Sequence, residues 1–111
     1  MIALPYANDL RVDRIKVVEY LLSVSNSRGK AQFFMRFGFN AETWQVLADA
    51  LIAQARSCTV VSEVESSYGT RYSVDGTIDT PSGRVPSPHV RTVWIWEPGT
   101  THLRLITAHP I

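Results

Sequence analysis

The sequence predicts a single α+β domain, residues 1–111, in which three N-terminal helices pack on a C-terminal four-stranded antiparallel sheet. Two observations favour this fold class. Apolar residues recur at helical spacing as far as residue 56, whereas from Thr59 onward they alternate with polar residues, as in strands that bury one face. Short turns join the expected strands and connect antiparallel neighbours, so the helices must cover one face of the sheet.

Three helices are expected, at 13–22, 30–37 and 40–56. Asp13 is a favourable N-cap for the first helix, and Gly38 is a natural stop for the second. The third helix has the clearest pattern, because its apolar residues fall at i, i+3, i+7 and i+11. We expect this stripe in the core, and it consists of Trp44, Leu47, Leu51 and Ala55.

The alternating half of the chain divides into four strands. They are expected, in order, at 59–65, 70–78, 90–97 and 103–109. In the second strand Tyr72 and Val74 share one face, because side chains two residues apart point the same way. We therefore expect both to be buried against the stripe of the third helix.

Composition limits the classes of function. The formal net charge is +1, far below that of a dedicated duplex-binding domain, although a local basic patch would suffice for transient RNA binding. The lone Cys58 can form no intramolecular disulfide. The sequence shows neither a signal-peptide pattern nor an apolar run of about 20 residues, so we expect a cytoplasmic protein that does not enter a membrane.

The sequence lacks the common motifs of metal and nucleotide chemistry, such as the phosphate-binding loop and the helical HExxH. His102 and His109 are seven residues apart on one expected strand, and an odd separation places them on opposite faces. We therefore expect neither a metal nor a cofactor.

Basic residues give two candidate phosphate-binding sets. Lys30 follows Gly29 at the expected start of the second helix, where the helix N-terminus attracts phosphate, but it can equally be a solvated first-turn residue. Three arginines lie inside expected strands, where they can bind a phosphodiester on the open sheet face or pair with carboxylates of neighbouring strands. The arginines are Arg71, Arg91 and Arg104, and the carboxylates are those of Glu63, Glu65 and Asp75.

Several segments resemble a family of uncharacterised bacterial proteins known as a domain of unknown function. They are GKAQFFMRFGF at 29–39, YGTRYSVDG at 68–76, TPSGRVPSPHVRTVWIWEPG at 80–99 and RLITAHP at 104–110. The corresponding family motifs are GKAxFFxRFGF, YGTRYxVxG, TPDGRxPxVRxVW and PRxVTAYP. The resemblance implies membership of a two-gene toxin–antitoxin-like pair, and the order of elements is similar to the barnase/RelE-like layout of small toxin ribonucleases, an analogy of fold only.

The family's characteristic polar positions match Lys30, Arg91, Arg104 and Thr107 in this chain. The chain departs from the family motifs at Ser82 in the turn, at Leu103 in place of proline and at His109 in place of tyrosine. The last change would alter the pKa and role of that group if it is functional.

The first functional hypothesis that the resemblance implies is a metal-independent endoribonuclease toxin, which acts on RNA and is paired with a small antitoxin-like protein encoded nearby. In such a reaction the ribose 2′-OH attacks the adjacent phosphate, helped by a base, an acid and cations. His109 would be the acid or base, and Thr107 would orient the phosphate. A hairpin centred on Pro98–Gly99 would pair Arg91 with residue 106 or 107, one diagonal neighbour from His109. The cations would be Lys30, Arg91 and Arg104.

The alternative is a non-catalytic protein-interaction module that binds a small partner through Trp94, Trp96 and the strand arginines. A catalytic site requires Lys30, Arg91, Arg104 and His109 to converge in one concave patch, whereas a binding module does not. An enzyme acting on a small molecule is a third option and would require a deep apolar pocket.

Overall fold

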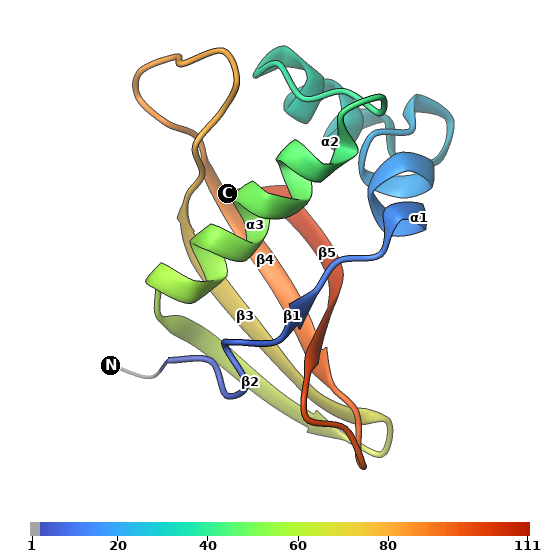
Figure 1. Cartoon of the computed structure of the whole chain (residues 1–111), viewed down its shortest axis with the longest axis vertical. Coiled ribbons are helices and arrows are strands. Elements are labelled where there is room, and N and C mark those ends of the chain that lie inside the picture. The colour runs from blue at the N-terminus through green and yellow to red at the C-terminus, as the bar shows by residue number, and fades with distance from the viewer. Residues whose placement is uncertain (1–2) are drawn as a thin grey trace.

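The computed structural model describes residues 3–111, which form a sheet with the helices gathered on one side (Figure 1). The strands are β1 Leu10–Arg11, β2 Val60–Ser66, β3 Gly69–Thr77, β4 His89–Trp96 and β5 Leu103–Pro110. They form one five-stranded sheet in the order β1-β5-β4-β3-β2. Strands β2 to β5 are antiparallel to their neighbours, while β1 runs parallel to β5.

The predicted four-stranded antiparallel sheet is wrong, because β1 precedes the helices and makes the sheet mixed. Leu10 pairs with Leu103, and the Leu103 N–H donates to the carbonyl of Asp9. Two residues are too short to show an alternating pattern. The strand forms because β5 offers it a free edge and because Leu10 becomes buried there, neither of which is visible in the local sequence.

Three helices occupy the predicted region with different boundaries. They are α1 Arg14–Lys16, which continues as the π-helix η1 Val17–Leu21, then α2 Val24–Arg36 and α3 Trp44–Ser57. Helix α2 begins earlier than predicted, because the Ser23 side chain caps it by accepting a hydrogen bond from the Asn26 N–H. Ser27 then leaves helical geometry, with φ −153° and ψ 61°, so α2 is kinked and Lys30 lies in the first turn after the kink.

The core lies between α3 and the sheet. Leu47, Leu51 and Val74 are fully buried, as predicted. Trp44 and Tyr72 are only half-buried, because Trp44 is the first residue of α3 and Tyr72 lies beside the edge strand β2. The stripe and the strand face therefore meet as expected, with their ends at the margin of the core.

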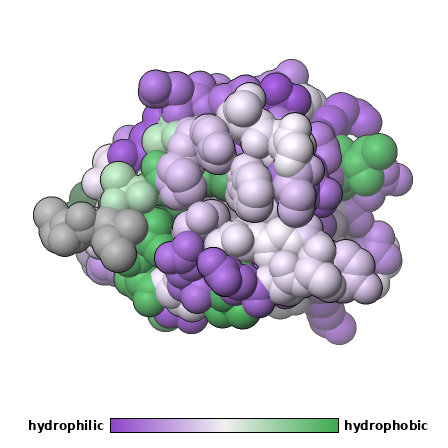
Figure 2. Space-filling view, turned by 90° about the horizontal axis from the view of Figure 1, so that it is seen from below, coloured by the Kyte–Doolittle hydropathy of each residue, from purple (hydrophilic) through white to green (hydrophobic). Residues whose placement is uncertain are grey.

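The face of the sheet opposite α3 is open in the described part of the chain. Figure 2 looks at the end of the molecule where the β2–β3 and β4–β5 turns lie, and the surface there is mostly hydrophilic or neutral, with hydrophobic residues in separate spots. Among residues 3–111, no helix has both the length and the apolar character needed to cross a bilayer.

Candidate functional site

A hydrogen-bonded cluster of Lys30, Tyr20 and Thr107 lies where α2 and η1 meet the edge of β5. The Lys30 ammonium donates to Tyr20 Oη at 2.7 Å and to Thr107 Oγ1 at 3.0 Å. It also lies 4.7 Å from the centroid of the Tyr20 ring, a cation–π contact. All three side chains are half-buried, so the cluster, which we call the lysine cluster, is ordered by its own bonds yet open to solvent.

The lysine cluster changes the acidity of its tyrosine. The hydrogen bond from Lys30 holds the pKa of Tyr20 below its usual value, the positive charge of Lys30 and bonds with Thr107 and Ser27 act in the same direction, and partial burial opposes them. A phenol of this kind gives up its proton more readily than an isolated tyrosine does. The cluster therefore combines a proton donor, a cation and a hydroxyl within one hydrogen-bonded group.

Sequence reasoning missed Tyr20. It is ten residues from Lys30, and no spacing rule brings them together. The approach depends on the π-helical turn η1 and on the kink at Ser27, which re-aim the two helices. A π-helix is frequent at functional sites, but the sequence of η1 gave no sign of it.

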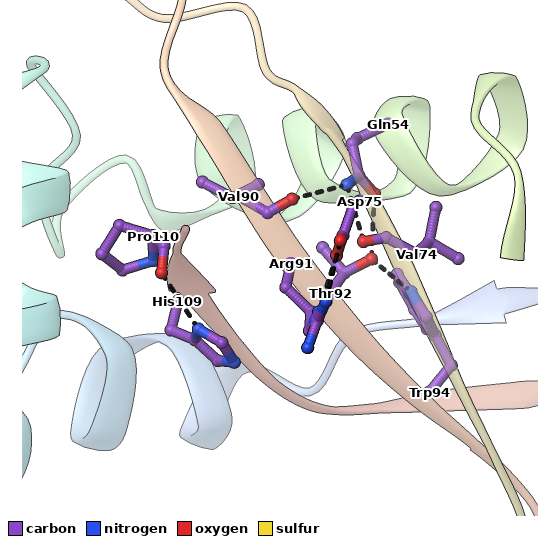
Figure 3. A network of polar contacts seen from close by, with 9 residues as sticks. All are labelled: Gln54, Val74, Asp75, Val90, Arg91, Thr92, Trp94, His109 and Pro110. Atoms are coloured by element: carbon purple, nitrogen blue, oxygen red, sulfur yellow. Dashed lines mark hydrogen bonds and ion pairs between the residues drawn. The ribbon is translucent and has the colours of Figure 1, made fainter. Parts of the chain in front are cut away.

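A second group lies on the open sheet face, where Asp75 of β3, Arg91 of β4 and His109 of β5 stand opposite one another in the register. Arg91 Nε and Nη2 donate to Asp75 Oδ1 and Oδ2 at 2.7 and 2.8 Å (Figure 3). The hydrogen bonds from Arg91 hold the pKa of Asp75 below its usual value, and partial burial of Asp75 opposes this lowering. The positive charges of Arg91, His109 and His89 lower the pKa further. We call Asp75, Arg91 and His109 the sheet-face row.

His109 lies directly opposite Arg91, so the predicted pairing of Arg91 with residue 106 or 107 is wrong by a few residues. Two features move the register. Trp96 pairs with Leu103, which centres the hairpin past Pro98–Gly99, and a bulge in β5 opposite Val93 adds a further residue. The shift brings the arginine and the histidine closer than expected.

The contact that His109 makes with the backbone suits one arrangement of its ring protons. Its Nδ1 lies 3.1 Å from the carbonyl oxygen of Pro110, and a carbonyl only accepts, so Nδ1 carries the proton in this contact. In the neutral ring, Nε2 then has a lone pair available to accept a proton.

The remaining predicted cation is farther away. Arg104 stands opposite Ile95, four residues along β4 from Arg91, which is roughly 13 Å at the rise of an extended strand. Its Nε lies 3.2 Å from Glu97 Oε1 in an ion pair. Lys30 with Thr107 and Arg91 with His109 thus form two neighbouring pairs that share β5, whereas Arg104 lies apart from both. The expected convergence of Lys30, Arg91, Arg104 and His109 in one concave patch is therefore not found for Arg104.

Other sequence expectations concern the tryptophans and metal ligands. Trp94 is fully buried and Trp96 half-buried, so Trp94 belongs to the core and forms no part of a partner surface. Among residues 3–111, no three His, Cys, Asp or Glu side chains are grouped so that they could hold a metal ion.

The fold defines a class, namely a small α+β protein whose N-terminal helices cover one face of a twisted sheet and leave the other face open. The chain belongs to the family described as "Domain of unknown function (DUF6883)", which matches residues 3–111. This confirms the predicted membership of a family of unknown function. A comparison with curated proteins finds no match.

Among solved structures, the chain is similar to one in the structure titled "Contact-dependent growth inhibition toxin - immunity protein complex from Klebsiella pneumoniae 342". The two chains are 18% identical, the match covers 90% of this chain and 98% of that chain, and the TM-score is 0.71. At this identity the likeness shows a shared fold.

Proposed function

We propose that the chain is the toxin of a toxin–immunity or toxin–antitoxin pair and that it cleaves RNA without a metal ion. The observation that carries the proposal is the Lys30 ammonium held between Tyr20 and Thr107, with Thr107 two residues before His109 on the same strand. The fold shared with a chain from a toxin–immunity complex supports the class of protein. RNA in the cytoplasm would be the substrate. A small protein encoded nearby would be the partner.

The lysine cluster and the sheet-face row supply the groups that this reaction requires. The 2′-OH loses its proton to a base and its oxygen bonds to the adjacent phosphorus, while the bond from phosphorus to the 5′-oxygen breaks and that oxygen takes a proton from an acid. The products are a 2′,3′-cyclic phosphate end and a free 5′-OH end. We assign the base to His109 Nε2 and the acid to the Tyr20 phenol.

Cations stabilise the extra negative charge of the transition state. Lys30 would contact a non-bridging oxygen, which Thr107 helps to orient. Arg91 uses Nε and Nη2 for Asp75, so Nη1 is the nitrogen that would reach the phosphate, and the carboxylate fixes its direction. Arg104, farther along the sheet, would contact a flanking phosphate.

A specific observation favours the alternative, a non-catalytic module that binds a small partner protein. Arg91 and Arg104 already pair with Asp75 and Glu97, which reduces the positive potential available to RNA. Under this alternative the sheet face is a polar recognition surface that includes Trp96 and the arginines, and its bonds are exchanged for bonds to the partner.

The test compares growth on induction and cleavage of single-stranded RNA by the purified protein in the presence of a chelator. The wild type should slow growth and cut RNA. Tyr20→Phe and His109→Ala should each reduce the cleavage rate about 10²- to 10⁴-fold, the usual contribution of an acid or a base. Lys30→Met and Arg91→Ala should also reduce it. His102→Ala is the matched control, since His102 lies outside both groups and precedes β5.

Two results would contradict the proposal. If the wild type is harmless and leaves RNA intact, the nuclease fails and the binding module replaces it. If wild type and variants are equally toxic while their melting temperatures match, the toxin class stands but these residues are not its site.

A further inference from the structure

A cavity of about 480 Å³ lies beside the sheet-face row, between the end of α2, the loop that joins β3 to β4, and the end of β5. Its lining includes Phe33, Phe37, Arg84, His89 and Pro110. Pro110 follows His109 directly, and His89 is two residues before Arg91, so the cavity lies next to the strand ends that carry the sheet-face row. Its volume lies within the range of sites that hold small ligands.

The lining has aromatic and cationic character. The rings of Phe33 and Phe37 have centroids 5.3 Å apart and are tilted by 57°, so they form an aromatic wall. The guanidinium carbon of Arg84 lies 6.0 Å from the centroid of the Phe37 ring, so a cation faces this wall. Among the described residues that line the cavity, none is acidic.

We propose that this cavity binds one unpaired RNA base, stacked on Phe37 and covered by the Arg84 guanidinium, next to the phosphate that is cleaved. Bases in single-stranded RNA bind proteins by stacking on aromatic rings and on guanidinium planes. The absence of acidic side chains in the lining suits a ligand attached to a phosphate. The inference rests on the proposed function, since it names the substrate group that is held beside the same site.

Of the two sides of the cavity, the one formed by Arg84 can move when a ligand binds. Arg84 is exposed, as is every residue of the loop from 81 to 86, whereas Phe37 packs against the core. A base stacked on Phe37 would therefore displace the arginine outward and leave the phenylalanine in place. The arginine then acts as a cover whose position depends on the ligand.

The closing experiment measures binding of ligands that cannot be cleaved, by titrating the protein with a ribonucleoside 3′-monophosphate and with ribose 5-phosphate. NMR shifts follow the backbone of each residue. The wild type should bind the nucleotide about tenfold more tightly than the sugar phosphate, which is the contribution expected of one stacked base. Only the nucleotide should shift the signals of Phe33, Phe37 and Arg84.

Phe37→Leu and Arg84→Gln should each remove most of this preference while leaving the binding of ribose 5-phosphate unchanged. Tyr68→Leu is the matched control, since Tyr68 is an exposed aromatic residue in the β2–β3 turn, at the opposite end of β3. Arg84→Gln keeps the test decisive if Phe37→Leu unfolds the protein, because Arg84 is on the surface.

Equal affinity for the two ligands, no detectable binding of the nucleotide, or a preference that survives both variants would each overturn the inference. The two proposals can fail separately. A wild type that prefers the nucleotide but leaves RNA intact overturns the proposed catalysis and keeps the base-binding cavity. A wild type that cuts RNA without any preference for the nucleotide keeps the catalysis and overturns the cavity.

Discussion

The two faces of β4 treat polar groups in opposite ways. On the face toward α3, Thr92 and Trp94 are fully buried, and among residues 3–111 every buried side-chain nitrogen and oxygen has a hydrogen-bond partner. On the open face, Arg91 is 39% exposed and bonds to a carboxylate that water can also reach. Neighbouring residues on one strand therefore differ in whether water can replace a lost partner.

On the buried face, hydrogen bonds from Gln54 of α3, which is only 2% exposed, join the helix to the sheet. Its Nε2 donates to the carbonyls of Val74 and Val90, and its Oε1 accepts from Thr92 Oγ1 (Figure 3). Trp94 Nε1 donates in turn to Thr92 Oγ1. This network ties the helix to β3 and β4 together. Asp75 and Arg91 lie on the other face of the same two strands, so the network holds together the strands that carry this ion pair.

The largest change in stability should come from a substitution in the core next to this network. Leu51→Ala should lower the free energy of unfolding by about 2–5 kcal/mol, because Leu51 is fully buried and the cavity left behind loses its contacts. A denaturant titration measures the loss. The control is Val46→Ala on the same helix, where the side chain is 44% exposed and the change should be small. A loss below about half a kilocalorie for Leu51→Ala, on the same scale, would remove Leu51 from the core.

The next effect tests the network itself. Gln54→Leu keeps a similar volume but removes the acceptor of the Thr92 hydroxyl proton and the amide donor that two backbone carbonyls share, which should reduce stability by about 1–3 kcal/mol. The exposed Gln45 on the same helix supplies the control, Gln45→Leu. Chemical denaturation compares the two variants. Equal stabilities would mean that the buried face tolerates unpaired groups as the open face does, and the contrast between the faces would be lost.

Much of the fold could be predicted because its signals are local. The stripe containing Leu47 and Leu51 and the alternation around Val74 are repeated over many residues, so α3 and strands β2 to β5 lie close to their predicted positions. The parallel strand at Leu10 depends on the far end of the chain, and the local sequence does not encode it. The burial of Gln54 is equally hidden, since a glutamine within a helix is usually on the surface.

The sequence predicted which residues belong to the candidate site better than it predicted which of them contact one another. No contact between Lys30 and Thr107 was expected, and the structure brings them together. The approach of Arg91 to His109 was predicted from the hairpin, although the two residues are directly opposite and not diagonal neighbours. Tyr20 was missed because the π-helical turn decides which way it points. Pairing depends on bulges and kinks that involve single residues, and periodicity averages over such details.

A third prediction concerns the acidity of Tyr20. The lysine cluster is half-buried, so its exposure to water lies between that of the buried face and that of the open face of β4. Lys30→Met should raise the pKa of Tyr20, because the hydrogen bond from Lys30 is the largest cause of its lowering. A pH titration of the tyrosine ring signals by NMR, with Tyr20→Phe to assign the signal, measures the shift. Lys16→Met is the matched control, since Lys16 lies 5.1 Å from the centroid of the same ring in a cation–π contact. An unchanged pKa in Lys30→Met would mean that the Lys30–Tyr20 bond is absent in solution, and Tyr20 would lose its assignment as the acid.

The smallest effect should come from the open face. Asp75→Asn should reduce stability at neutral pH only slightly, because ion pairs that water reaches contribute little. The pKa of Asp75 is lower in the folded protein than in the unfolded chain, where it is about 3.9. The ion pair therefore stabilises the fold at pH values above the pKa of the unfolded chain, and this stabilisation is lost as the pH falls through the pKa of the folded protein. Unfolding measured from neutral to acid pH should therefore show a weaker dependence in Asp75→Asn than in the wild type, whereas Asp49→Asn, at an exposed position on α3, should follow the wild type. If Asp75→Asn and the wild type lose stability identically in acid, the carboxylate does not hold Arg91 in solution. The guanidinium would then be fully available to a phosphate, and the ion pair that favours a non-catalytic role would no longer argue against the nuclease.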